Sequence, residues 1–81
     1  MDDLVARLVE GEIRIALALM ETAVLNLKTG NLKALAEARK RAESAYLRAR
    51  THVDELPDNM RQTYSVQLVA LRSAIDGLPV S

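Results

Sequence analysis

His52 is the single histidine of the 81-residue chain and the first side chain to consider for proton transfer or phosphoryl chemistry. A metal site would need further nitrogen or sulfur ligands, but the sequence has no second histidine and no cysteine. Glu12 is a carboxylate that could form an acid–base pair with His52, and such a pair would need a cleft for a substrate. No sequence feature indicates that cleft. We therefore expect structural roles for both side chains, and no catalytic residue, cofactor or metal.

Positive charge is concentrated in the middle of the chain, which raises a second kind of chemistry, the binding of an anionic partner. Residues 1–30 carry three basic and five acidic side chains, residues 31–53 carry six and two, and residues 54–81 carry two and four. The side chains that would contact a nucleic acid or another polyanion are Arg39, Lys40, Arg41, Arg48 and Arg50.

Two observations weaken this polyanion hypothesis. The basic residues fall on two flanks of one predicted helix, and two tyrosines are the only aromatic residues available for stacking on bases. We instead expect these residues to pair with acidic side chains, and the four-residue spacing permits Glu37–Arg41 and Arg39–Glu43 pairs within the helix.

The composition indicates one small domain that covers residues 1–81. The net charge is zero, 49% of the residues are hydrophobic and 2% are aromatic. Without cysteine the chain forms no disulfide, and it contains no apolar run of about twenty residues that would span a bilayer. Asp2 and Asp3 differ from the positive start of a secretory signal. The sequence therefore predicts a cytoplasmic domain that does not contact a membrane.

Two interruptions divide the chain into helices. Gly30 and Asn31 are suited to ending one helix and capping the next, and Pro57 fits the first turn of a helix. Gly77 followed by Pro79 predicts a third stop. We predict helices at about 2–29, 31–54 and 57–76. Because the connections are short, the expected fold is an all-α, up-down-up antiparallel three-helix bundle.

The last two predicted helices each carry one apolar stripe. Helix 57–76 presents larger side chains, namely Met60, Tyr64, Leu68, Leu71, Ile75 and Leu78. Helix 31–54 presents mostly alanine, namely Leu35, Ala38, Ala42, Ala45 and Ala49, followed by Leu56. Small residues allow a neighbouring helix to approach closely. With Gly30 at the turn, the numbers of facing residues add to about 60, so that Glu12 lies near Arg48 and Ile15 near Ala45.

The first predicted helix is apolar around roughly 200° of its circumference, more than one neighbour can cover. This helix is expected to be either central in the bundle or partly covered by another chain. A chain of this length buries about 60% of its unfolded surface, so that association would add to its stability. We predict a partner-binding surface, in a homodimer or with another protein, from Ile13, Leu17, Met20, Val24, Leu47, Val66 and Val69.

The hairpin resembles two families of helical modules. The residues that carry the likeness are Ala23, the run Lys28-Thr29-Gly30-Asn31-Leu32, Ala34, Ala42, the run Ala45-Tyr46-Leu47, and Ala49. Tetratricopeptide repeats and microtubule-interacting-and-trafficking domains similarly use a glycine-containing turn and then an alanine-rich helix with a tyrosine. The sequence lacks the aromatic residues that usually surround that turn. The resemblance implies an interaction module that accepts a partner helix or extended peptide in a groove between helices, and it transfers no binding residue.

These observations favour a non-catalytic helical module for protein–protein interaction or self-association, which buries apolar surface of the first helix against its partner. The alternative is nucleic-acid or polyanion binding through the basic middle helix. An enzyme built around His52 and Glu12 is the third hypothesis, and it requires a substrate pocket.

Overall fold

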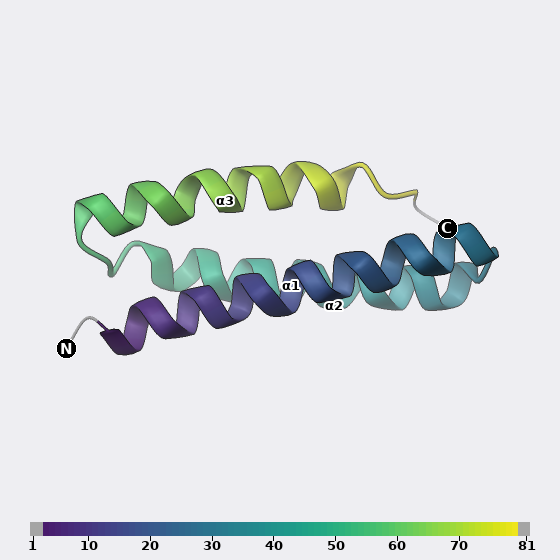
Figure 1. Cartoon of the computed structure of the whole chain (residues 1–81), viewed down its shortest axis with the longest axis horizontal. Helices are drawn as coiled ribbons and strands as arrows, with labels where there is room; N and C mark the ends of the chain where they lie inside the picture. Colours follow the sequence, from purple (N-terminus) through teal and green to yellow (C-terminus); the bar gives the residue numbers. More distant parts are fainter. Residues whose placement is uncertain (1–2, 80–81) are drawn as a thin grey trace.

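Three helices make up the fold in the computed structural model, which describes residues 3–79. They are α1 (Asp3–Thr29), α2 (Leu32–Val53) and α3 (Asp58–Asp76), and they run up, down and up beside one another (Figure 1). The predicted all-α three-helix bundle is confirmed, and the described helix ends lie within one residue of the predicted ones. The predicted helix start at residue 2 lies outside the described residues.

The turn between α1 and α2 forms at the predicted glycine. Gly30 has a φ of 77°, a left-handed conformation that glycine adopts without steric strain. The side chain of Asn31 accepts a hydrogen bond of 3.2 Å from the backbone N–H of Ala34 and so caps α2. This tight connection makes α1 and α2 antiparallel neighbours.

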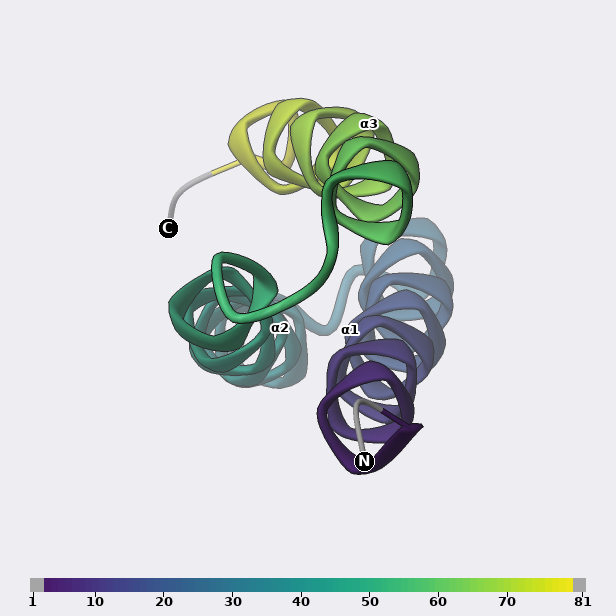
Figure 2. The same cartoon turned by 90° about the vertical axis from the view of Figure 1, so that its left-hand side faces the viewer.

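The connection between α2 and α3 is fixed by a buried leucine and a proline. Leu56 is buried against the core, and Pro57 precedes the first turn of α3 with a φ of −57°. The Pro57 carbonyl accepts a 2.8 Å hydrogen bond from the N–H of Arg61, which starts the helical hydrogen-bond pattern. The chain therefore reverses direction here, and α3 lies over the α1/α2 hairpin (Figure 2).

The seam between α1 and α2 is built from alanine. The buried alanines of this seam are Ala16 and Ala23 on α1, and Ala38, Ala42, Ala45 and Ala49 on α2. Since an alanine side chain is a single methyl group, the two backbones approach each other more closely than either approaches α3. The predicted alanine stripe is confirmed.

Larger side chains attach α3 to this hairpin. Leu68, Leu71 and Ile75 are buried in the main core cluster, and Met60 and Tyr64 pack against it half-buried. The predicted stripe of α3 is thus confirmed in full, since Leu78 is also buried beyond the end of the helix. The α1/α2 hairpin consequently has one face covered by α3 and another face without a covering helix among the described residues (Figure 2).

Candidate interaction site

A second apolar stripe runs along α1 on the side away from the core. Its members recur at alternating intervals of four and three residues, the spacing of one helix face. The four large side chains of the stripe are exposed by 75% (Leu4), 42% (Leu8), 49% (Ile15) and 62% (Leu25). We call this face the outer stripe, and its residues are Leu4, Leu8, Gly11, Ile15, Ala18, Thr22 and Leu25.

The middle of the outer stripe lines the floor of an open groove between α1 and α2, with a volume of about 730 Å³. The α1 residues that line it are uncharged, namely Ile15, Ala18, Leu19 and Thr22. The α2 residues that line it are all polar or charged, namely Glu37, Lys40, Arg41, Ser44 and Arg48. This α1/α2 groove therefore has an apolar floor and a rim of three cations and one carboxylate. None of its lining residues comes from α3.

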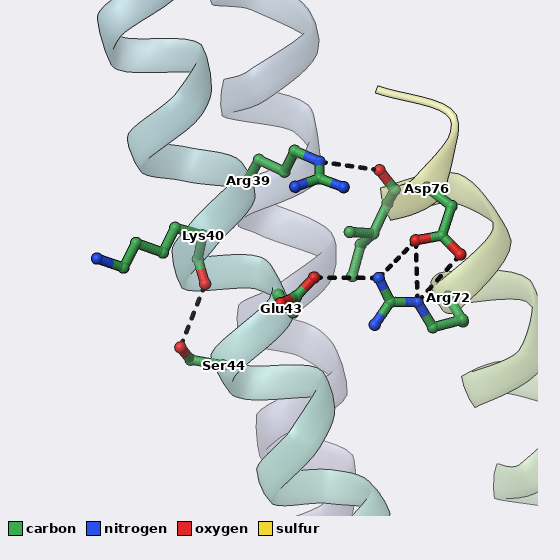
Figure 3. Close-up of polar contacts among 7 residues, drawn as sticks. Arg39, Lys40, Glu43, Ser44, Arg72 and Asp76 are labelled. Carbon is green, nitrogen blue, oxygen red and sulfur yellow. Dashed lines mark hydrogen bonds and ion pairs between the residues drawn. The ribbon is translucent and has the colours of Figure 1, made fainter. Parts of the chain in front are cut away.

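The cations of the rim differ in their partners. The Nε of Arg48 donates a hydrogen bond of 2.7 Å to Oε2 of Glu12, which raises the pKa of the Arg48 guanidinium. Arg41 lies 3.4 Å from Glu37, and both side chains are largely exposed. The ammonium group of Lys40 forms no ion pair within residues 3–79, and Figure 3 shows its side chain pointing away from α3. Lys40 and Arg41 are therefore available to an anionic group in the groove.

Glu12 lies at the border between the core and the α1/α2 groove. Its side chain is only 12% exposed, and Arg48 supplies the cation that the hairpin register predicts for it. Its second oxygen, Oε1, is buried and accepts no hydrogen bond from the residues that the structure describes. An unpaired buried oxygen is destabilising, and the ion pair with Arg48 offsets part of that cost.

His52 pairs with Glu55 and not with Glu12. Its Nδ1 lies 2.8 Å from Oε2 of Glu55, in the connection after α2. The acid–base pair of Glu12 with His52 is not formed, because each residue is bonded to another side chain. His52 is half-buried at the end of α2, where a protonated imidazole interacts favourably with the helix dipole.

A cluster around Arg72 joins α3 to α2 on the opposite side of the hairpin (Figure 3). The Nη2 of Arg72 lies 3.0 Å from Glu43 of α2 and 2.5 Å from Asp76 of α3. The guanidinium group also lies 5.1 Å from the centre of the Tyr46 ring. These hydrogen bonds raise the pKa of Arg72 and lower the pKa of Asp76.

The Arg72 cluster overturns one of the two ion pairs expected for the basic residues of α2. Glu43 bonds to Arg72, and Arg39 donates a 3.4 Å hydrogen bond to the Ile75 carbonyl, so that the Arg39–Glu43 pair does not form (Figure 3). The predicted Glu37–Arg41 pair is present. Arg50 lines a groove between α2 and α3, away from Lys40 and Arg41. The basic residues of α2 therefore do not share one surface.

The residues predicted to bind a partner are distributed around the bundle. Ile13 is buried in the core and Met20 packs against it half-buried, so that Ile13 faces the other helices and not a partner. Leu17 lines a groove between α1 and α3, whereas Val69 lines the groove between α2 and α3. The exposed side chains of this set are Leu17, Val24, Leu47, Val66 and Val69.

The outer stripe was not predicted from the sequence, although its residues recur at alternating intervals of four and three, the pattern of one helix face. Leu4, Leu8 and Ile15 lie within the wide apolar arc of the first helix, whereas Leu25 lies outside it, and only the placement of α3 separates these residues from the core side. In the described part of the chain, no three His, Asp or Glu side chains gather where they could hold a metal ion. No helix within residues 3–79 has both the length and the apolar character needed to cross a bilayer.

The chain matches no protein-family model, no curated protein and no solved structure.

Proposed function

We propose that this protein is a non-catalytic helical interaction module, which buries the outer stripe of α1 and the adjoining α1/α2 groove against a helix of a partner. The observation that carries the proposal is the exposure of Leu4, Leu8, Ile15 and Leu25 on one helix face. An isolated exposed leucine is common on protein surfaces, but several large apolar side chains exposed on one helix face are typical of binding sites.

The energetics of burial support this proposal. Covering a Leu or Ile side chain completely contributes about 1.5–3 kcal/mol, so that each half-exposed member of the stripe would contribute on the order of 1 kcal/mol. The outer stripe spans residues 4–25, which corresponds to roughly 30 Å of helix at 1.5 Å per residue. A partner helix of about six turns could therefore lie along it and use the spacing of an ordinary helix-in-groove complex.

A neutral helical peptide provides the test. The peptide carries a leucine stripe at three- and four-residue spacing, with glutamine on its other faces, and is titrated into isotope-labelled protein. We expect amide chemical-shift changes concentrated along the outer stripe. Leu8→Ser/Ile15→Ser should abolish the changes, while Val66→Ser/Val69→Ser, two exposed apolar residues on α3, should leave them intact.

Sedimentation equilibrium of the unliganded protein completes this experiment by measuring self-association. A dimer that Leu8→Ser/Ile15→Ser converts to monomer would support the module with a second copy as its partner. A strictly monomeric chain that shows no shift changes with the peptide would contradict the proposal.

Polyanion binding is the second candidate function, and the exposure of Lys40, Arg41 and Arg50 supports it. Such binding weakens steeply as salt concentration rises, because it releases condensed counterions. Mixed-sequence DNA and RNA at low salt are the probes. The absence of binding there would eliminate this function.

A further inference from the structure

We infer that the partner helix in the α1/α2 groove belongs to another protein and is acidic and amphipathic, with its apolar face on Ile15 and Leu19 and its carboxylates against Lys40 and Arg41. This inference rests on the proposed function and specifies the chemistry of the partner. It follows from the charge of the rim, from Gly11 in the outer stripe, and from the symmetry that a second copy would impose.

The charges of the groove are arranged asymmetrically. All of its charged lining residues come from α2, while the α1 residues that form its floor are uncharged. Lys40 has no ion-pair partner within residues 3–79, and Arg41 has only the long, exposed contact with Glu37. A helix with carboxylates beside its apolar stripe would place negative charge at this rim, which gives electrostatic complementarity.

Gly11 gives a second, independent indication that a helix approaches α1. A glycine in the interior of a helix is destabilising relative to alanine, and the α1 backbone around Gly11 is ordinary helix. A Cβ atom added at Gly11 would meet nothing within 4 Å, so that packing inside this chain does not require glycine. An external helix that crosses α1 closely near Gly11 and Ala18 would require small residues there.

A second copy of the chain fits this groove less well. Two-fold symmetry brings the same surface patch of both subunits together. Such an interface would gather two sets of Lys40, Arg41 and Arg48, with Glu37 as the only carboxylate among the groove-lining residues of each copy. Like charges placed together in an interface are strongly unfavourable. An acidic helix avoids this repulsion.

A nucleic acid also fits less well. Phosphates could contact Lys40 and Arg41, but the groove floor formed by Ile15, Ala18 and Leu19 presents no hydrogen-bond donor to a phosphate. No aromatic side chain lines the groove, although base stacking on aromatic rings contributes much of single-strand binding. The apolar floor and the cationic rim together match an amphipathic acidic peptide.

Three helical peptides of equal length test the inference. They share one leucine stripe and carry glutamate, glutamine or lysine beside it, and their dissociation constants are measured by calorimetry at low and high salt. We expect the glutamate peptide to bind about tenfold more tightly than the glutamine peptide at low salt and the lysine peptide to bind most weakly. The difference should shrink at high salt, since salt screens exposed charges.

Two charge-matched variants locate the interaction. Lys40→Glu should remove the preference for the glutamate peptide, whereas Arg50→Glu changes the net charge equally on the other side of α2 and should preserve it. Ala18→Leu should weaken binding of all peptides at least tenfold by filling the groove, with an unchanged helical circular dichroism spectrum.

The other outcomes overturn the inference in distinguishable ways. Equal affinity for all three peptides would leave the interaction module standing and reject an acidic partner. Self-association through the outer stripe would identify a second copy as the occupant, and displacement of the glutamate peptide by mixed-sequence DNA would indicate a nucleic acid. The absence of both peptide binding and self-association would reject the proposed function as well.

Discussion

The two faces of α1 differ in how far their apolar residues are buried. The inner face, which packs against α2 and α3, is built largely of small side chains, with Ala6, Val9, Ile13, Ala16 and Ala23 buried. The outer stripe holds four large side chains that are exposed, Leu4, Leu8, Ile15 and Leu25, and between them the smaller Gly11, Ala18 and Thr22. Large side chains would add most to a hydrophobic core, yet these four leucine and isoleucine side chains of α1 lie outside it. The difference shows that the bundle does not use its full apolar surface to fold.

The close approach of α2 explains the inner face. Alanines on both helices of this seam leave room only for small side chains, and a leucine there would force the helices apart. No corresponding restriction acts on the outer stripe, since no helix covers it among residues 3–79. Its leucines therefore contribute little to the stability of the isolated bundle, and the proposed partner would bury them.

A pair of isoleucines tests this comparison with the largest expected effect. Ile13 is 3% exposed and Ile15 is 49% exposed, only two residues apart on the same helix. Ile13→Ala should lower the free energy of unfolding by about 2–5 kcal/mol, because it leaves a cavity in the core. Ile15→Ala should lower it by no more than about 1 kcal/mol. Urea unfolding measures both, and equal losses would contradict the assignment of faces.

A pair of alanines gives the next largest expected effect. Here the substitution enlarges the side chain, whereas the isoleucine variants shorten it. Ala16 is buried in the seam and Ala18 is exposed on the outer stripe. Ala16→Leu should cost about 1–3 kcal/mol of stability through overpacking, whereas Ala18→Leu should change it by less than about 0.5 kcal/mol. Thermal unfolding compares the two variants. A seam that accepts leucine at Ala16 without loss would show that close packing does not control the inner face.

Gly11→Ala tests whether the outer stripe is free of packing constraints within the chain. With open space around the added methyl group, the substitution should raise the free energy of unfolding by about 0.5–1 kcal/mol through the higher helix propensity of alanine. Chemical denaturation measures this gain. A loss of stability would mean that Gly11 contacts its own chain.

Tyr64 provides the smallest effect, at the edge of the inner face where α1 meets α3. Partial burial, the negative charge of Glu10 and the 3.3 Å hydrogen bond to that carboxylate raise the pKa of the Tyr64 hydroxyl. Because the folded pKa is raised, the stability contribution is fully present below about pH 10, the ordinary tyrosine value, and is lost as pH rises through the folded pKa. The free energy of unfolding should therefore fall less between pH 9 and 11 in Tyr64→Phe than in the parent protein. Parallel curves would exclude this contribution.

Local signals in the sequence predicted the helices and one inter-helical pair. Gly30 and Pro57 set the helix ends because their backbone conformations are incompatible with an uninterrupted helix. The tight Gly30 turn then fixed the register of α1 against α2, and the Glu12–Arg48 pair follows from that register. The α3 contacts could not be derived in the same way. The pairing of Arg72 with Glu43 depends on how α3 lies across the hairpin.

The sequence by itself therefore determined where the helices begin and end, the alanine stripe of α2, the apolar stripe of α3, and how α1 faces α2, although it did not predict the burial of Tyr46 and Val53. These properties depend on neighbouring residues and on one short turn. Only the tertiary structure decided which part of the wide apolar arc of α1 is core and which is the outer stripe. Periodicity shows that a helix has more apolar surface than one neighbour can cover, but the position of α3 selects the side that is buried.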